Sequence, residues 1–257
     1  MIKLLKEGKL WMVAVAALLL SCAHTKLVKT KTTDIKISVN DSTSGEKSIQ
    51  QLIQPYKSSM EGEMNEVIGR SAMEMEKAQP EGQLGNFVAD LVFQKAMEKY
   101  KPQDGKMPDF CLINNGGLRT SLPQGDITKR NAFELMPFEN EIVVVTISGE
   151  KAKELFDYIA TVGGQPVSNI KMGIQNQQPY HIYIGKESFD EKRTYKVVTS
   201  DYLAQGGDNM TFFKEPLKLE NLQYKIRDAI IDFIWEENLN GKEIKSNLDG
   251  RIYEIQP

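Results

Sequence analysis

Three short stretches of the chain carry residue types that could hold a small ligand with a flat ring and polar groups. The first reads Asn-Asn-Gly-Gly-Leu-Arg at 114–119 and follows an apolar run at 110–113 that predicts a buried strand. Paired glycines let the backbone turn sharply and approach a ligand, and an arginine offers a planar fork of N–H donors. We therefore predict that one wall of a binding site consists of Asn115, Gly116, Gly117 and Arg119.

The other two stretches each supply an aromatic ring. Phe138 and Asn140 lie just before an apolar run at 142–147, and Tyr202 lies shortly before a Gly-Gly-Asp turn. Two aromatic rings can sandwich a flat base, and a carboxylate can accept hydrogen bonds from ribose hydroxyls. We predict that this part of the site consists of Phe138, Asn140, Tyr202, Gly206, Gly207 and Asp208.

The order and spacing of these loops resemble the C-terminal, substrate-specificity domain of the bacterial 5'-nucleotidases and UDP-sugar hydrolases. The resemblance runs from about residue 64 to 257 and includes a Leu-Gly-Asn helix segment at 84–86 and an Ile-Ser-Gly-Glu helix start at 147–150. In that family two aromatics stack on the two faces of the nucleobase. The resemblance implies this role for Phe138 and Tyr202, and ligand contacts for Arg119, Asn140 and Asp208.

The chain departs from the family's pattern at three places. Family members often carry arginines shortly before the Leu-Gly-Asn helix, where this chain reads Glu-Met-Glu-Lys at 74–77. The Gly-Gly-Asp turn continues with Asn209 and Met210 rather than glycine and an aromatic, and asparagine tolerates a left-handed backbone. Tyr202 stands where phenylalanine is common, a change that keeps the stacking face.

Each stretch also has a simpler explanation when it is considered alone. Asn-Gly-Gly after a strand is a common turn, and an aspartate after two glycines can cap one. An aromatic between a proline and a strand, such as Phe138, often belongs to the core. The shared order and spacing of all three stretches favour ligand binding over these explanations.

Metal chemistry is expected on a different polypeptide. Full-length relatives begin with a phosphoesterase domain whose histidine-rich runs bind two metal ions that activate water. The present sequence has two histidines, His24 and His181, and neither lies in such a run. We therefore expect no catalytic residue, metal or other cofactor in this chain, and a divalent metal pair in a separately encoded metallophosphoesterase partner.

The first residues predict a lipoprotein signal. Three lysines precede an apolar run at 11–20, which is too short to span a bilayer as a helix and ends in Leu-Leu-Ser-Cys. This ending resembles a bacterial lipobox and predicts a signal peptide at 1–21 and lipidation of Cys22; the alternative is an uncleaved anchor. The expected location is the cell envelope, with the chain lipid-anchored to a membrane on the periplasmic side or in the outer membrane.

Charge and cysteine content argue against two kinds of function, nucleic-acid binding and catalysis by a cysteine. The chain carries a net charge of −3, which becomes more negative once residues 1–21 are removed, and it has no basic runs. Nucleic acid is therefore not an expected partner, because binding to phosphates requires a positive surface. With Cys22 lipidated, Cys111 has no partner for an intrachain disulfide, and its apolar neighbours predict a buried strand residue rather than a nucleophile.

The elements that must position the site alternate along the chain. After a polar tether at 22–33, we predict a single α/β (α+β) domain at 34–257, with a mixed β-sheet packed by helices. It begins with an edge strand near Ile35 and a helix broken near Pro55, whose apolar stripe we expect in the core. Further strands are expected at 110–113, 142–147, 180–184 and 195–199, and helices at 83–100, 150–160 and 222–235.

Two functions follow from these observations. The chain could be the nucleotide- or nucleoside-binding specificity half of a split 5'-nucleotidase-type hydrolase, holding base and ribose while its partner hydrolyses the phosphate ester. Alternatively, it could be a non-catalytic nucleotide-binding or scaffolding lipoprotein of the cell envelope. The stacking aromatics favour the first function, and the missing upstream arginines favour the second.

Overall fold

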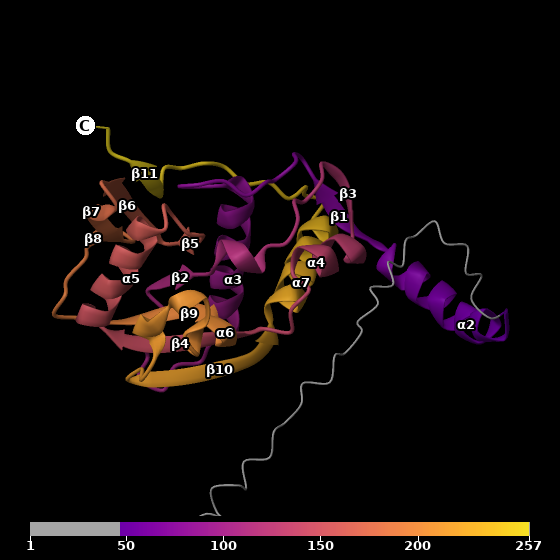
Figure 1. Ribbon diagram of the computed structural model, residues 1–257, viewed down its shortest axis with the longest axis horizontal. Coiled ribbons are helices and arrows are strands. Elements are labelled where there is room, and N and C mark those ends of the chain that lie inside the picture. Colours follow the sequence, from indigo (N-terminus) through magenta and orange to yellow (C-terminus); the bar gives the residue numbers. More distant parts are fainter. Residues whose placement is uncertain (1–46, 257) are drawn as a thin grey trace, which may run out of the picture. The chain divides into compact units, whose positions relative to one another are not determined.

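The computed structural model describes residues 47–256 (Figure 1). Residues from Gln51 onward form one compact unit. The signal peptide, Cys22, the tether and the strand near Ile35 lie outside the described residues, so these features stay predictions.

Helix α2 (Lys47–Met64) differs from the sequence-based expectation in two ways. It continues through Pro55, where a break was predicted; proline removes one N–H from the hydrogen-bond ladder, but the turns on both sides stay helical. Its apolar stripe is exposed, with Ile49, Leu52, Ile53 and Tyr56 between 50% and 76% accessible, so the prediction of a core stripe was wrong. Helical spacing shows which residues share a face but not what covers that face.

The central feature is a five-stranded mixed sheet in the order β10-β4-β9-β2-β5. Strand β2 runs parallel to β9, and the other neighbours are antiparallel. Strands β4, β9 and β2 are the inner strands, and β4 and β9 are largely buried, as expected for runs rich in β-branched residues. The bounds are β2 (Phe110–Leu112), β4 (Glu141–Ser148), β5 (Val167–Ser168), β9 (Thr194–Ser200) and β10 (Lys218–Lys225).

Two smaller sheets accompany it, whereas the sequence suggested one sheet. A four-stranded sheet has the order β11-β6-β7-β8, and a two-stranded sheet pairs β1 with β3. The chain passes from β5 to β6 through the single residue Asn169, whose φ of 61° turns it out of the first sheet. The bounds are β1 (Val67–Ser71), β3 (Gly125–Thr128), β6 (Ile170–Gln175), β7 (Gln178–Ile184), β8 (Glu187–Ser188) and β11 (Ile252–Glu254).

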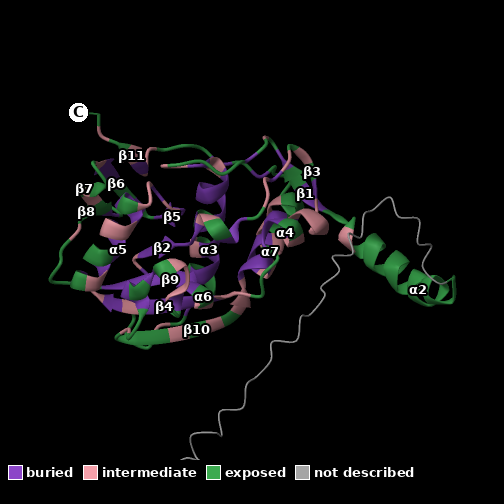
Figure 2. Cartoon of the chain, viewed as in Figure 1, coloured by how far each residue is buried: buried purple, intermediate pink, exposed green. Residues whose placement is uncertain are grey.

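Helices cover both faces of the central sheet. Alternate side chains of β4 point to opposite faces: Val144 packs with α3 (Gln83–Lys99) and α7 (Ile226–Leu239), whereas Val145 packs with α5 (Gly149–Thr161). The sheet therefore separates two apolar cores. Figure 2 colours the buried residues of the sheet and of its covering helices purple. These two cores fix the ends of β2 and β9, where the first and third predicted binding loops begin, and the start of β4, where the second one ends.

Most predicted elements are confirmed with small shifts of their ends. Helix α3 ends one residue before the predicted Tyr100, although Met97, expected on its apolar face, is exposed. The helix predicted at 222–235 begins only at Ile226, because residues 218–225 pair with β4 as the edge strand β10. Helical spacing alone did not reveal that this segment completes a sheet.

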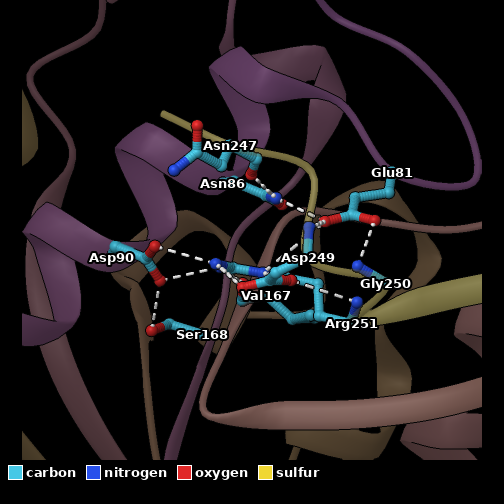
Figure 3. Close-up of polar contacts among 9 residues, drawn as sticks. All are labelled: Glu81, Asn86, Asp90, Val167, Ser168, Asn247, Asp249, Gly250 and Arg251. Atoms are coloured by element: carbon cyan, nitrogen blue, oxygen red, sulfur yellow. Dashed lines mark hydrogen bonds and ion pairs between the residues drawn. The ribbon is translucent and has the colours of Figure 1, made fainter. Parts of the chain in front are cut away.

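Arg251 ties the C-terminal strand to the rest of the fold (Figure 3). Its guanidinium donates to both carboxylate oxygens of Asp90, at 2.7 and 2.9 Å, to Asp249 at 2.8 and 2.9 Å, and to the carbonyl of Val167 at 2.8 Å. Burial alone would lower the pKa of Arg251, but the hydrogen bonds to the two carboxylates outweigh it and raise that pKa. Arg251 therefore stays protonated, and its hydrogen bonds link the start of β11 to α3 and β5.

Candidate functional site

The first loop leaves β2 and forms a short 3-10 turn, Asn115–Gly117. Its backbone is fixed by a bond from Asn115 N to the side-chain oxygen of Gln165 at 2.9 Å and by a bond from Arg119 N to Leu135 O at 2.8 Å. Neither Gly116 nor Gly117 has a positive φ. Glycine is needed for space instead, because a Cβ at Gly117 would lie 2.9 Å from the side-chain oxygen of Asn114.

The second loop connects helix α4 (Lys129–Leu135) to β4. Thr128 and Asn131 form a capping box that stabilises the start of α4, and the loop follows the other end of this helix. Phe138, at the loop's tip, is 40% accessible, so it is not the core residue that its position between Pro137 and a strand would suggest.

The third loop follows β9 and contains the short helix α6 (Asp201–Ala204) and the 3-10 turn Gly207–Asn209. The turn adopts left-handed backbone at Gly206, Asp208 and Asn209, with φ values of 90°, 51° and 62°. Asparagine at 209 accepts this conformation, as expected from the sequence. Gly207 lies against the ring of Tyr202: a Cβ there would be 2.5 Å from two ring atoms.

Asp208 joins the first and third loops. Its carboxylate accepts a hydrogen bond from Asn114 Nδ2 at 2.5 Å and another from the Tyr202 hydroxyl at 2.8 Å. The same hydroxyl accepts from the Asp208 N–H at 3.2 Å, and the Tyr158 hydroxyl donates to the Asp208 carbonyl at 2.9 Å. The hydrogen bond to the carboxylate raises the pKa of Tyr202, so the tyrosine stays protonated as a donor.

The three loops enclose a cavity of about 280 Å³. Among the described residues that line it, Arg119 is the one cation and Asp208 the one anion. The volume lies near the lower end of the roughly 300–1,000 Å³ that is usual for ligand pockets. The lining residues are Asn114, Gly116, Gly117, Arg119, Phe138, Asn140, Tyr202 and Asp208.

The structure thus places most of the predicted site residues around one cavity, with three differences in detail. Asn115, Gly206 and Gly207 belong to the same loops but do not line the cavity. Asn114, which lines it, was not among the predicted contacts, and Tyr158 was missed altogether. No short-range pattern reveals these two, because they reach Asp208 across 94 and 50 residues of sequence.

A larger hollow of about 910 Å³ lies elsewhere, between β1, α7 and residues 241–245. Its charged side chains largely pair with one another: Arg70 with Asp126 and Glu243, and Lys242 with Glu237 at 3.7 Å. This lining, in which most charges are paired, offers no convergent set of donors or rings, so the smaller cavity is the better candidate for a ligand site.

The remaining candidate groups have structural surroundings. Across residues 47–256 no three His, Cys, Asp or Glu side chains are grouped to hold a metal ion. His181 lies on β7 with Nδ1 3.4 Å from the Tyr253 hydroxyl. Cys111 is fully buried, and burial raises the pKa of its thiol, as expected for a packing residue. None of the helices in the described part is both apolar and long enough to cross a membrane.

Comparison with known proteins relates this arrangement to one family. A sequence model of the family described as "5'-nucleotidase, C-terminal domain" matches residues 61–215. The trifunctional nucleotide phosphoesterase protein YfkN of Bacillus subtilis is 25% identical over 85% of this chain, and the cell wall protein Lmo0130 of Listeria monocytogenes is 27% identical over 87%. The chain covers 16% and 31% of the lengths of these two proteins.

A solved structure agrees at the level of the fold. The 5'-nucleotidase precursor from Thermus thermophilus superposes with a TM-score of 0.68 and 22% identity, over 81% of this chain and 43% of that one. The mixed α/β fold expected from the sequence is therefore confirmed.

Proposed function

The chain belongs to the 5'-nucleotidase C-terminal domain family, and we propose that it is the nucleotide- or nucleoside-binding specificity half of a split 5'-nucleotidase-type hydrolase. The observation that carries this proposal is the single cavity at which Arg119, Phe138, Asn140, Tyr202 and Asp208 converge. Few charges and two half-exposed rings suit a flat, mostly uncharged group such as a nucleoside better than a polyanion.

Five of the lining residues have a chemical role in this proposal. Phe138 and Tyr202 offer ring faces for stacking on the base, and the carboxylate of Asp208 accepts hydrogen bonds from ribose hydroxyls. Asn114 and Tyr202 hold that carboxylate in place, and each of its oxygens retains a further lone pair. Arg119 directs N–H donors toward the anionic end of a nucleotide.

The hydrolytic step is assigned to a separate metallophosphoesterase in the same envelope. Its divalent metal pair would activate water and stabilise the charge that develops on the phosphate ester. A role of this chain in nucleotide breakdown is supported by its similarity to the trifunctional nucleotide phosphoesterase, of which it covers 16%.

A second candidate function is that of a non-catalytic nucleotide-binding or scaffolding lipoprotein. The observation in its favour is the acidic pair Glu74 and Glu76, at the place where family members often carry arginines. A site with Arg119 as its one lining cation would then retain nucleosides without presenting a phosphate for cleavage.

A phosphate-release assay separates these functions. We expect the purified chain, with added divalent metal, to release no phosphate from AMP or UMP, because the hydrolytic metal pair belongs to the partner. A partner recovered by co-purification should hydrolyse both nucleotides and should be more selective with this chain present. Chelator-sensitive turnover that co-elutes with the chain alone would contradict the split arrangement, and unchanged partner kinetics would favour the non-catalytic alternative.

We also propose that a lipid on Cys22 anchors the chain to a membrane of the cell envelope. A Cys22→Ser variant is expected to leave the membrane fraction and appear as soluble or unprocessed protein, because acyl chains supply the membrane affinity. Cell fractionation with metabolic labelling by a fatty acid measures this. A variant that still fractionates as processed membrane protein would show that the anchor lies elsewhere.

A further inference from the structure

Arg227, near the start of α7, contacts the loop that carries Phe138 and Asn140. The residue is only 6% accessible, and its guanidinium is centred 4.2 Å above the ring of Phe133. Its Nη1 atom lies 3.5 Å from Met136 O and 3.4 Å from Phe138 O, and its Nη2 atom forms an ion pair with Glu139. One buried side chain therefore contacts three residues of a loop that has no regular structure.

The neighbours of Arg227 hold the same loop. The Ile226 N–H donates to Asn140 O at 2.9 Å, and Lys225 forms a second ion pair with Glu139. Three consecutive residues at the start of α7 thus contact residues 136–140. Carbonyl groups in an irregular segment need donors from outside it, and this helix start supplies them.

Glu139 is ionised at physiological pH, so protonation of its carboxylate does not break the ion pair. Hydrogen bonds from Lys225 and Arg227 lower the pKa of Glu139 to about 2. Bonds of 3.4–3.5 Å are individually long, so the restraint comes from their combination with the ion pair and the stacking on Phe133.

We infer that Arg227 is a positioning residue of the ligand site: it holds residues 136–140 so that the Phe138 ring and the Asn140 side chain line the cavity. Arg227 does not itself line the cavity, so it would act through the loop. The inference rests on the proposed function. A purely structural role differs in its consequence, because it would lower the stability of the fold without a separate loss of ligand binding.

The test compares Arg227→Met and Arg227→Lys with the control Lys242→Met, which removes an ion pair with Glu237 near the other end of α7 and leaves the contacts to residues 136–140 in place. Calorimetric titration with AMP, UMP and adenosine is combined with thermal melts and with amide exchange at 136–140. Losing the stacking of one ring weakens binding by roughly five-fold to more than 100-fold, so we expect Arg227→Met to bind roughly 10- to 100-fold more weakly. Its loop amides should exchange faster while those of α3 stay unchanged. Arg227→Lys should be intermediate, and Lys242→Met should bind like the wild type.

The outcomes separate this inference from the proposed function. If the wild type binds and Arg227→Met binds equally well with unchanged loop exchange, the inference is overturned. If the wild type binds none of the three ligands, the proposed function fails. Unchanged amide exchange at 136–140 in Arg227→Met would then overturn the inference too. Faster exchange there would show that Arg227 holds the loop. Should Arg227→Met not fold, Arg227→Lys and Glu139→Gln carry the test: weaker binding in both supports the inference, and wild-type binding in both overturns it.

Discussion

Replacing Arg251 by methionine is expected to lower the free energy of unfolding by about 3 kcal/mol, the lower end of the range for a broken buried ion pair. The variant would leave Asp90, Asp249 and the carbonyl of Val167 without their shared donor. The lower end applies because both carboxylates are about half exposed and water can solvate them in part. For a domain of this size each kcal/mol corresponds to roughly 2–4 °C, so the melting temperature should fall by about 6–12 °C.

Arg193→Met is the matched control for this experiment. Arg193 pairs with Glu187 at the surface, where an ion pair contributes about 0–1 kcal/mol. Denaturant unfolding of both variants measures the difference, and amide exchange at β11 should show local loosening in Arg251→Met. Equal losses in the two variants would mean that the Arg251 cluster does not secure the C-terminal strand.

Replacing Phe138 or Tyr202 by alanine is expected to weaken nucleoside binding from five-fold to more than a hundred-fold. The estimate takes roughly 1–3 kcal/mol of stacking per ring and about 1.4 kcal/mol per tenfold change in affinity. The melting temperature should change little, because the rings are 40% and 43% accessible. A core aromatic would instead cost about 3–5 kcal/mol of stability on truncation to alanine.

Three further variants sharpen this measurement. Gly207→Ala should also weaken binding, because its Cβ would meet the Tyr202 ring at 2.5 Å and displace it. Arg119→Ala should reduce affinity for AMP more than for adenosine. Tyr180→Ala, which removes an equally exposed tyrosine outside the cavity, should leave binding unchanged. Large melting losses for Phe138→Ala and Tyr202→Ala, with no ligand bound by the wild type, would mean that the loops are only structural.

The sequence identified those parts of the fold whose signals are local. The runs of β-branched residues in β4 and β9 and the apolar face of α3 each fit within one segment, so they were predicted almost to their ends. The order of the three binding loops was also readable, because each loop follows directly from a strand or helix end.

Features that depend on residues far away in the sequence could not be predicted from it. Residues 218–225 became a strand because β4 offers an open edge, and the exposure of the α2 stripe depends on what packs against it. The hydrogen bonds of Asp208 come from Asn114 and Tyr158, and the contacts of Arg227 cross about 90 residues of sequence. Such contacts are set by the folded chain rather than by a local pattern.

The paired hydrogen bonds between Tyr202 and Asp208 lower the entropic cost of binding a ligand at this site. With its hydroxyl bonded to both the carboxylate and the N–H of Asp208, the tyrosine loses its rotational freedom during folding, before any ligand arrives. Immobilising a flexible side chain on binding costs about 0.5–1.5 kcal/mol, a cost that a phenylalanine at this position would still incur with each ligand. The ring and the carboxylate are also coupled mechanically, so a displacement of either one moves the other.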